Sequence, residues 1–551
     1  MNFRILSIFI LFCCVGLNQM IAQPDPLAGK DTLTLENERV EDVKDSNKPF
    51  VAPPYQEIKK GQSAPQNYFS KDFYIQTDFE PAPPQIKPLP RTRKEQLLNN
   101  YLKLGFGRFV TPYAKLYLNN GRDQNVDYGF DFTHISAHND TQIPLRRFRQ
   151  NEANAKLKFI SDAATVNGGI HIYNTSYFNY ADTAEFATEE LREDALRNGF
   201  TRVKIGGNVV SNYDPRAVYD YNIGTNLKFF NGNNGNRDLI LNLSPNAAYF
   251  LGEKAKIGIE TNIEFMTGKT EDLNQARIFL DALPYFSLQG DQLQLRIGPQ
   301  LNFFNNNADT SSVGFAGIVA EVSYEIVPDG FAIQAGYLSG MTNHTYYDMI
   351  YQNPYMQRLI NLKPSVERLN VYGGIKGNIA REIDFSGRIY YKRITDQPIF
   401  VNTPQGSTFD VVYDSLMTVF GFHAEVNYDL EENFKAGAAV TVNNYTTNTL
   451  PKFYNAAPLR LDVFAKYLYE DQLSVSANLT TYGSRPMALS DTGEILRDGL
   501  FVDISFGADY RINENFSVFL NLYNLLNSNY QRWHNYPERQ LDFRGGITLS
   551  L

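Results

Sequence analysis

Hydrophobic and polar residues alternate one by one along much of the chain from about residue 101 onward. The stretches 219–229, 254–265 and 500–510 each place aliphatic and aromatic residues on one face and polar residues or glycine on the other. A period of two is the pattern of a β-strand with one apolar and one polar face. These stretches are about 11 residues long, which exceeds the roughly 5–6 residues of a usual globular strand and matches the roughly 9–11 residues that cross a bilayer at a tilt.

The connections between these stretches alternate between short polar turns and longer loops. The turn 251–253 is followed by the loop 268–275, and the turn 328–330 by the long loop 341–366. Later connections keep the same order of turn and loop: 381–382, 394–416, 431–433, 445–457, 470–471, 484–499, 513–514 and 525–540. Short turns on one side and long loops on the other are typical of outer-membrane barrels. A soluble β-sandwich has no reason to sort its loops in this way, and a propeller would show blade repeats, which the sequence lacks.

The alternation predicts an all-β fold, a transmembrane antiparallel outer-membrane β-barrel of about 22 strands, with 18 or 20 strands left open. The predicted strands are 101–110, 112–119, 126–136, 153–161, 165–176, 200–211, 217–229, 237–249, 254–267, 276–288, 291–304, 313–326, 330–340, 367–379, 383–393, 417–429, 433–444, 458–469, 472–483, 500–511, 515–524 and 541–551. An even number places both ends of the barrel on the periplasmic side.

Composition agrees with this interpretation only when it is mapped onto the strands. The chain of 551 residues contains 39 Phe, 35 Tyr and 38 Gly but 1 Trp. Its mean hydropathy of −0.35 excludes a helical membrane protein, which needs apolar runs of about 20 residues. We expect the aromatic residues mainly on the lipid face and in the interfacial girdles. The net charge of −9 argues against a nucleic-acid partner.

The first hundred residues predict export and an extended arm. Arg4 precedes the apolar stretch 5–17, and Ala22 stands at a plausible cleavage position, so residues 1–22 are expected to be a signal peptide. Lipidation at Cys13 or Cys14 is the alternative, but Phe12 stands where a small residue is required. Eleven of the 26 prolines lie in the following segment, which predicts residues 23–100 to be an extended periplasmic arm or a lumen-filling segment before the barrel at 101–551.

The last predicted strand carries a candidate signal for the barrel-assembly machinery. Arg544, Gly546, Leu549 and Leu551 match a polar-x-Gly-x-x-apolar-x-apolar pattern of terminal strands. Such a strand can pair with another sheet through its free edge during insertion. The alternative is a chance amphipathic C-terminus.

The end of the chain resembles the C-terminus of TonB-dependent receptors. The resemblance rests on Asn521–Asn527, Tyr530–Trp533, Tyr536–Arg539 and the closing strand, and it is specific over about the last 35 residues. The Ala-Gln at the expected cleavage site and the Tyr- and Asn-rich strands resemble such proteins of Bacteroidota. The resemblance implies a 22-stranded barrel in the bacterial cell outer membrane that takes part in nutrient uptake.

The sequence departs from that family before the barrel. The family normally has a plug domain of more than a hundred residues, whereas 23–100 is proline-rich and lacks the plug's Gly-rich, β-branched pattern. A lumen of this width must then be filled by the arm, by inward-folded loops or by a periplasmic or surface partner.

A short segment near the expected mature N-terminus looks like a TonB box. Its residues are Asp31, Thr32, Leu33, Thr34 and Leu35. In this family such a segment adds as a strand to a TonB-type energising protein. The alternative is an ordinary linker pentamer, which would match the same pattern.

The motifs of enzymes and cofactor sites are missing, so we expect no enzyme, no cofactor and no metal. The six histidines are scattered, and no nucleophile elbow or phosphate-binding loop is present. Some charged residues are expected to face the lumen, with an ordinary polar lining as the alternative reading. These candidates are Lys254, Lys256, Glu260, Glu264, Asp503, Asp509 and Arg511. Tyr346, Tyr347, Tyr351 and Tyr355 are expected either to stack on a carbohydrate or peptide or to pack their loop over the lumen.

Two functions remain open from the sequence. The first is uptake of a nutrient too large for a general porin, through a barrel in the outer-membrane lipid bilayer. The second is a non-transporting barrel that acts as a scaffold or accessory subunit of an outer-membrane complex, which the missing plug favours. An enzyme is a distant third.

Overall fold

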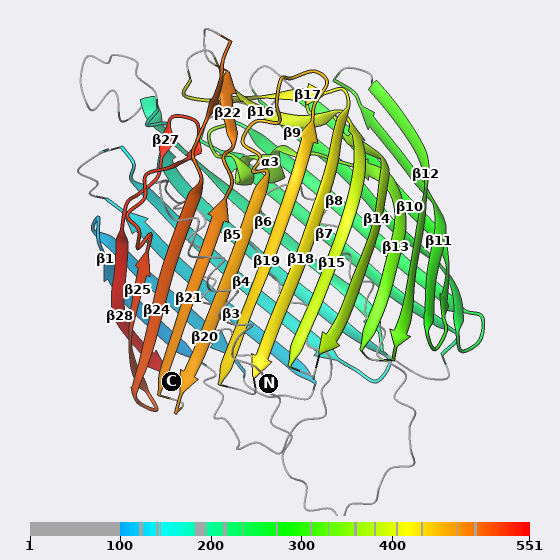
Figure 1. Cartoon of the computed structure of the whole chain (residues 1–551), viewed down its shortest axis with the longest axis horizontal. Coiled ribbons are helices and arrows are strands. Elements are labelled where there is room, and N and C mark those ends of the chain that lie inside the picture. Colours follow the sequence, from blue (N-terminus) through cyan, green and yellow to red (C-terminus); the bar gives the residue numbers. More distant parts are fainter. Residues whose placement is uncertain are drawn as a thin grey trace, which may run out of the picture.

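The wall strands form one closed antiparallel sheet in which the first strand pairs with the last (Figure 1). The described residues of this computed structural model are 100–120, 125–138, 143, 145–181, 193, 195–212, 217–233, 235–270, 274–308, 311–328, 330–356, 361–379, 382–403, 406–430, 433–470, 472–489 and 493–550. The sheet has 22 strands, which confirms the predicted fold class and strand number. The signal peptide, the arm up to residue 99 and Leu551 lie outside the described residues.

The wall strands fall on the predicted ranges. Their bounds are β1 (Tyr101–Gly107), β2 (Thr111–Asn119), β3 (Val126–Ala137), β4 (Phe148–Ile160), β5 (Ala164–Phe178), β6 (Arg197–Ser211), β7 (Tyr219–Gly232), β8 (Arg237–Phe250), β9 (Ala255–Lys269), β10 (Asn274–Gln289), β11 (Leu293–Asn306), β12 (Ser311–Val327), β13 (Phe331–Thr342), β14 (Ser365–Ile379), β15 (Ile383–Thr395), β18 (Met417–Leu430), β19 (Phe434–Thr446), β20 (Leu459–Tyr469), β21 (Leu473–Tyr482), β24 (Phe501–Asn513), β25 (Phe516–Tyr523) and β28 (Asp542–Ser550). The first strand is shorter than predicted, because Phe109 and Val110 adopt left-handed backbone conformations that end it.

The long loops contain small elements that the sequence pattern did not predict. These are the helix α3 (Tyr346–Gln352) and three two-stranded hairpins: β16 (Gln397–Asn402) with β17 (Phe409–Asp414), β22 (Pro486–Leu489) with β23 (Ile495–Arg497), and β26 (Gln531–Trp533) with β27 (Tyr536–Pro537). All four lie at the end of the barrel opposite the short turns (Figure 1). We call this end the loop end and the other the turn end. Because 22 is even, β1 begins and β28 ends at the turn end, where Tyr101 pairs with Ser550.

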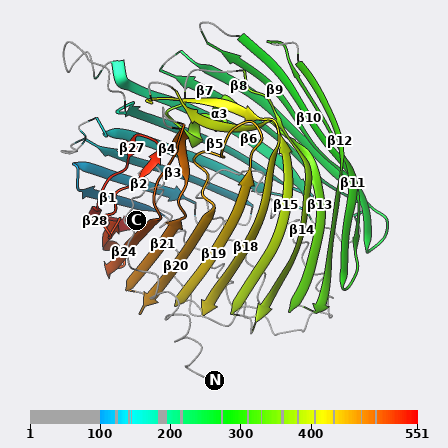
Figure 2. The ribbon, with the colours of Figure 1, turned by 45° about the horizontal axis from the view of Figure 1, so that its top comes forward.

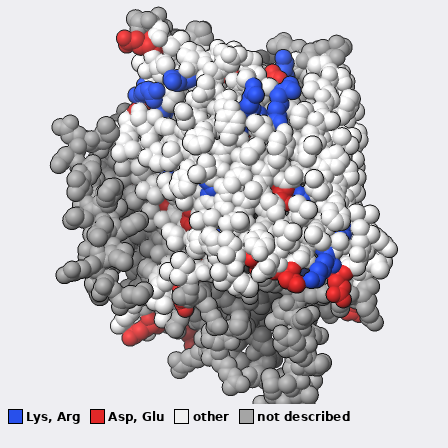
Figure 3. Space-filling view, turned by 45° about the vertical axis from the view of Figure 1, so that its right-hand side comes forward, with Lys and Arg blue, Asp and Glu red and all other residues white. Residues whose placement is uncertain are grey.

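The two faces of the wall differ in the way that the alternation predicts. In β9, Ile257, Ile259 and Phe265 are exposed on the outside, whereas Glu260 and Glu264 lie on the inner face. Figure 3 shows a broad belt with few charged atoms, and most of the Lys, Arg, Asp and Glu side chains lie near its two ends. None of the helices in the described ranges is long and apolar enough to cross a membrane.

Small residues form the seam that closes the sheet between β1 and β28. Gly105 and Gly546 are direct partners across this seam. A Cβ on Gly546 would overlap the Leu104 carbonyl oxygen and lie 2.6 Å from the Gly105 Cα, and a Cβ on Gly105 would lie 2.7 Å from the Phe519 ring. The inner surface of the seam is completed by Lys103, whose ammonium lies 4.0 Å from the Phe519 ring centre and 3.2 Å from the Asp509 carboxylate. Glycine is therefore required where the two strands approach each other.

Candidate functional site: a lumen closed by inward-folded loops

Three loops of the loop end fold into the mouth of the barrel. They are residues 343–356 and 361–364 with α3, residues 396–403 and 406–416 with β16 and β17, and residues 524–541 with β26 and β27. In Figure 2, with the loop end turned forward, α3 lies inside the ring of wall strands. We call these three loops and the wall residues beneath them the lumen closure.

The lumen closure and the inner wall share one buried hydrophobic core. Its members come from the inner faces of seven consecutive strands, from the two ends where β13 and β14 meet the loop, and from the loops themselves. They are Tyr173, Tyr177, Phe200, Phe230, Ile240, Met266, Phe279, Phe304, Met341, Tyr346, Tyr347, Met349, Ile350, Tyr355, Met356, Leu362, Val366, Phe400, Phe409, Trp533 and Tyr536. Removing an aromatic side chain of this size from water contributes about 2–3 kcal/mol, so the loops are held in the lumen by the same force that builds a globular core.

Stacked tyrosines join the three loops to one another. The Tyr355 and Tyr536 rings stack with centres 3.5 Å apart and an interplanar angle of 18°. The Tyr536 hydroxyl donates to the Ser407 carbonyl, and the Tyr177 hydroxyl of β5 donates to the Pro354 carbonyl. Each hydroxyl thus gives a loop carbonyl a hydrogen-bond donor. Of the two expected roles for the loop tyrosines, packing over the lumen is the one that the structure shows for Tyr346, Tyr347 and Tyr355, which are buried.

The single tryptophan of the chain lies within this core. Trp533 packs its ring edge against Phe400 and Phe409, with ring centres 5.4 and 5.2 Å away. The Phe409 backbone amide in turn donates to the Tyr355 carbonyl over 3.1 Å. Trp533 therefore contacts residues of a second loop, and one of these, Phe409, is hydrogen-bonded to the third loop. Its fluorescence should respond to the packing of all three loops.

The short helix α3 forms where the chain supplies a cap and an apolar surface. Thr345 is the N-cap, and its hydroxyl accepts a hydrogen bond from the Asp348 amide over 3.1 Å. A helix of seven residues is not stable alone. It is held because Tyr346, Tyr347, Met349 and Ile350 are buried against the wall.

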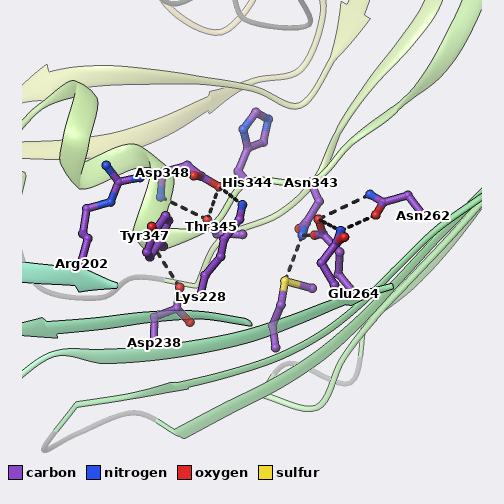
Figure 4. A network of polar contacts seen from close by, with 12 residues as sticks. Arg202, Lys228, Asp238, Asn262, Glu264, Asn343, His344, Thr345, Tyr347 and Asp348 are labelled. Carbon is purple, nitrogen blue, oxygen red and sulfur yellow. Dashed lines mark hydrogen bonds and ion pairs between the residues drawn. The ribbon is translucent and has the colours of Figure 1, made fainter. Parts of the chain in front are cut away.

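Charged residues of the wall bind one side of α3 (Figure 4). The Asp348 carboxylate lies 3.5 Å from the Lys228 ammonium of β7 and 3.7 Å from the Arg202 guanidinium of β6. The Arg202 guanidinium also lies 4.0 Å from the centre of the Tyr347 ring. On β8, the Asp238 carboxylate accepts a hydrogen bond of 3.2 Å from the Tyr347 amide. Wall charges on three neighbouring strands thus fix the position of the helix.

A second set of polar contacts binds the chain just before α3. Asn343 donates to the Glu264 carboxylate over 2.6 Å, and the Arg277 guanidinium of β10 donates to the His344 carbonyl over 3.0 Å. The His344 ring makes a 2.8 Å hydrogen bond with the Ser365 hydroxyl. The lumen-facing candidate Glu264 is therefore part of the closure.

The charge states around α3 follow from burial and from these neighbours. Burial lowers the pKa of His344 to about 4, with Arg277 adding to the shift and Asp348 opposing it. Burial acts to raise the pKa of Asp348, but Lys228 and Arg202 outweigh it and hold that pKa below its usual range. At neutral pH His344 is neutral and Asp348 is charged, as the contacts require.

The remaining lumen-facing candidates are dispersed along the wall. Glu260 pairs with Arg296 of β11 over 2.6 Å, and Asp503 accepts a hydrogen bond of 3.1 Å from the Asn524 amide. Lys256 lies on the inner face near the turn end of β9, and Arg511 is exposed at the turn end of β24. Lys254 lies in the turn before β9 rather than in the strand, and it pairs with Asp291 of the next turn over 2.9 Å. Asp509 lies apart from these residues, at the seam, where it pairs with Lys103.

The candidate assembly signal is largely described by the structure, whereas the candidate TonB box is not. In β28, Arg544 and Gly546 face the lumen, where Arg544 lies 3.7 Å from the Asp542 carboxylate, and Leu549 shares the outer face of Phe543. Asp31–Leu35 and Leu551 lie outside the described residues.

The sequence interpretation did not identify Arg202, Lys228, Asp238 and Asp348 as a group. The available signal was the length of the loop 341–366 together with its run of tyrosines. The histidines remain separate: His134 lies in β3 and contacts Asn151 and Ser136. Within the described ranges, no group of three or more His, Cys, Asp or Glu residues is placed to hold a metal ion.

Solved transporter structures share this architecture. The iron transporter FrpB of Neisseria meningitidis (F3-3 variant) is 12% identical, with a TM-score of 0.63 over 82% of this chain and 81% of that one. The pyoverdine outer membrane receptor FpvA of Pseudomonas aeruginosa is 12% identical, with a TM-score of 0.63 over 83% and 80%. The ferric-catecholate import receptor Fiu of E. coli is 11% identical, with a TM-score of 0.60 over 82% and 81%. No family model and no curated protein matches the chain, so these similarities establish the fold.

Proposed function

We propose that this protein is an outer-membrane barrel that takes part in nutrient uptake, and that its lumen is closed at the outer end by its own loops. One observation carries the proposal: a single buried core runs from the inner wall through α3 to the hairpins of two further loops. The proposal is supported by a fold shared with an iron transporter and with import receptors.

The placement of the chain in the cell is part of the proposal. The apolar belt of the wall suits the hydrocarbon core of a bilayer, with the short turns in the periplasm and the long loops outside. Residues 1–22 would direct export, and the barrel-assembly machinery would read the terminal strand. The arm at 23–100 would take the place of the plug that Bacteroidota-type TonB-dependent receptors carry, and Asp31–Leu35 would engage a TonB-type energising protein.

The closure suggests how such a barrel would work. A 22-stranded ring leaves a wide interior, so passage through it depends on what fills it. Here the loops are held by aromatic packing and by a few ion pairs rather than by strand ladders. Loops held in this way can leave the lumen while the wall stays intact, because the wall is held by backbone hydrogen bonds between strands and the loops are held by side-chain contacts.

Channel recordings of the purified protein in planar lipid bilayers test the closure. Replacing residues 346–356 by a glycine-serine linker should convert a low, intermittent conductance into a large, steady one. A control replacement of residues 489–495, which connect β22 and β23 and contribute no residue to the shared core, should leave the conductance low. Equal conductance of the wild type and the 346–356 variant would overturn the proposed closure.

Energised transport has its own test in cells. Deleting Asp31–Leu35 should reduce uptake and growth to the level of a strain that lacks the protein. Unchanged uptake and growth would exclude coupling to a TonB-type protein through this segment.

The second candidate function is a scaffold or accessory subunit of an outer-membrane complex. The dense packing of the lumen favours it, because a sealed barrel presents its loops as a fixed surface. Affinity purification from native outer membranes separates the two functions. A stoichiometric partner that remains bound when the 346–356 segment is replaced would support the scaffold.

A further inference from the structure

Three cationic side chains share one patch of the inner wall beneath α3. Lys204 of β6 and Lys228 of β7 are direct cross-strand partners, and Arg202 lies on the same face of β6. Like charges directly opposite each other in a sheet destabilise it. Such an arrangement is stable only if an anion lies between the charges or if water screens them.

Within the described ranges, one carboxylate lies at ion-pair distance from these three cations. Asp348 lies within 3.7 Å of Arg202 and within 3.5 Å of Lys228. Lys204 has no ion pair or hydrogen bond within the described part of the chain, and its side chain is exposed to the lumen. The Asp348 side chain is enclosed by the wall and its own loop, yet 44% of it is exposed to the lumen, so open space adjoins both groups.

The neighbouring acids are engaged elsewhere. Glu152 pairs with His171, the residue opposite Lys204 on β5, over 3.0 Å. Glu264 accepts hydrogen bonds from Asn343 and Asn242 over 2.6 and 3.2 Å. Asp238 accepts the Tyr347 amide. Asp348 is thus the one carboxylate at ion-pair distance from these cations in the described ranges, and an open position remains beside Lys204.

We propose that Arg202, Lys204 and Lys228 form a binding site for a solute that carries a carboxylate or phosphate group, and that Asp348 occupies part of this site when the loops are closed. The inference rests on the proposed uptake function for its physiological role and names the class of solute. Guanidinium and ammonium groups bind such oxyanions through charge-assisted hydrogen bonds.

Competition with Asp348 couples the site to the closure. An oxyanion that bridges Lys204 and Lys228 displaces the Asp348 carboxylate and removes two of the contacts that hold α3. The helix ends at Gln352, and three residues later Tyr355 stacks on Tyr536, the cross-strand partner of Trp533. Solute binding therefore loosens the three loops, and Trp533 reports this change.

Titrations of the purified full-length protein in detergent test the proposal, with inorganic phosphate and succinate as separate probes. Binding is followed by calorimetry and by Trp533 fluorescence. Lys204→Gln should weaken binding of the preferred probe about tenfold, as expected for the loss of one charged contact of about 1.4 kcal/mol. Asp348→Asn should strengthen binding by a similar factor, because the competing carboxylate is gone. The tighter of the two probes identifies whether phosphate or carboxylate is the preferred group.

Two control variants keep the result interpretable. Lys256→Gln removes a lumen-facing lysine near the turn end and should leave binding unchanged, and Lys204→Arg should retain it. Folding of every variant is checked by its heat-modifiable gel mobility. Equal affinity of the wild type and Lys204→Gln, or no gain in Asp348→Asn, would overturn the site.

The binding test can fail or succeed independently of the test of the proposed function. Binding is measured without any transport, whereas opening of the lumen is measured by conductance of the 346–356 variant. Anion binding by a barrel that never conducts would retain the site and exclude uptake. Absence of binding in a barrel that opens would retain uptake and exclude this class of solute.

Discussion

The wall of the barrel and the lumen closure are built from the same chain by different interactions. In the wall, backbone hydrogen bonds join each strand to the next and close the ring between β28 and β1. The side chains determine which face of the sheet points outward and which points into the lumen. In the closure, side chains do most of the joining: rings stack, tyrosine hydroxyls donate to loop carbonyls and three wall charges contact α3. One barrel thus combines a ring held by backbone hydrogen bonds with a filling held by side-chain contacts.

The difference is also one of residue chemistry. The outer wall is covered by Ile, Leu, Val, Phe and Tyr side chains that are exposed on the outside of the barrel. The closure uses tyrosine where a loop carbonyl needs a donor and methionine where the space between rings is irregular, as with Met349 and Met356. The closure can therefore be weakened by single substitutions that leave the wall unaffected.

The largest expected effect comes from breaking the ring at its seam. Gly546→Val places a side chain against the Leu104 carbonyl and Gly105, where neither backbone can yield, so most of the protein should fail to form a closed barrel. The measurement is the fraction with heat-modifiable gel mobility after refolding. Gly373→Val is the control, because nothing lies within 4 Å of a Cβ at that position. Equal folded fractions for the two variants would contradict the role of the seam.

The next largest effect comes from emptying the closure while the ring stays whole. Tyr536→Ala removes the stacking partner of Tyr355 and the hydrogen bond to Ser407, which should destabilise the docked loops by about 3 kcal/mol. Conductance should rise and Trp533 fluorescence should shift, with gel mobility unchanged. Tyr536→Phe keeps the stack and should give an intermediate result. A loss of barrel folding in Tyr536→Ala would show that the two regions are not separable.

A smaller effect is expected from acid, and it acts on the closure alone. The pKa of His344 is about 4 when the loop is docked and about 6.5 when it is released, so the released loop binds more protons as the pH falls from 6.5 to 4. Docking should therefore be fully stable above pH 6.5 and should lose about 2 kcal/mol by pH 5. A pH titration of Trp533 fluorescence measures the change. His344→Gln should abolish it, and an unchanged midpoint in this variant would assign the transition to another group.

The smallest effect is expected at the turn end, where an ion pair is exposed. Lys254 and Asp291 lie 2.9 Å apart, yet their side chains are 55% and 86% exposed. Lys254→Gln should change the free energy of unfolding by less than about 0.5 kcal/mol, because water screens the pair. Denaturant unfolding followed by Tyr circular dichroism measures the difference. A change above about 1 kcal/mol would show that water does not screen this exposed pair.

The wall was predictable from the sequence and the closure was not. Alternation in 219–229 or 254–265 assigns a face to each residue, because a strand has a fixed period and a barrel repeats one rule. Asp348 contacts Arg202 and Lys228 only because two strands and a distant loop come together in the fold, and no sequence period encodes that contact. The expectation that aromatic residues lie mainly on the lipid face is incomplete for the same reason. Phe200, Phe230 and Phe279 point inward to receive α3 and its neighbours.

The seam at Gly105 and Gly546 also has a consequence for how the barrel comes into being. Lys103 and Asp509, which meet beside it, are 406 residues apart in the chain. Contacts of such long sequence separation form late, because the entropy of joining the ends must be lost before any pairing compensates for it. Strand β1 is therefore expected to pair with β2 early and with β28 last. Until the last strand arrives, β1 presents an unpaired edge that other chains can add to, and it needs shielding on its way to the membrane.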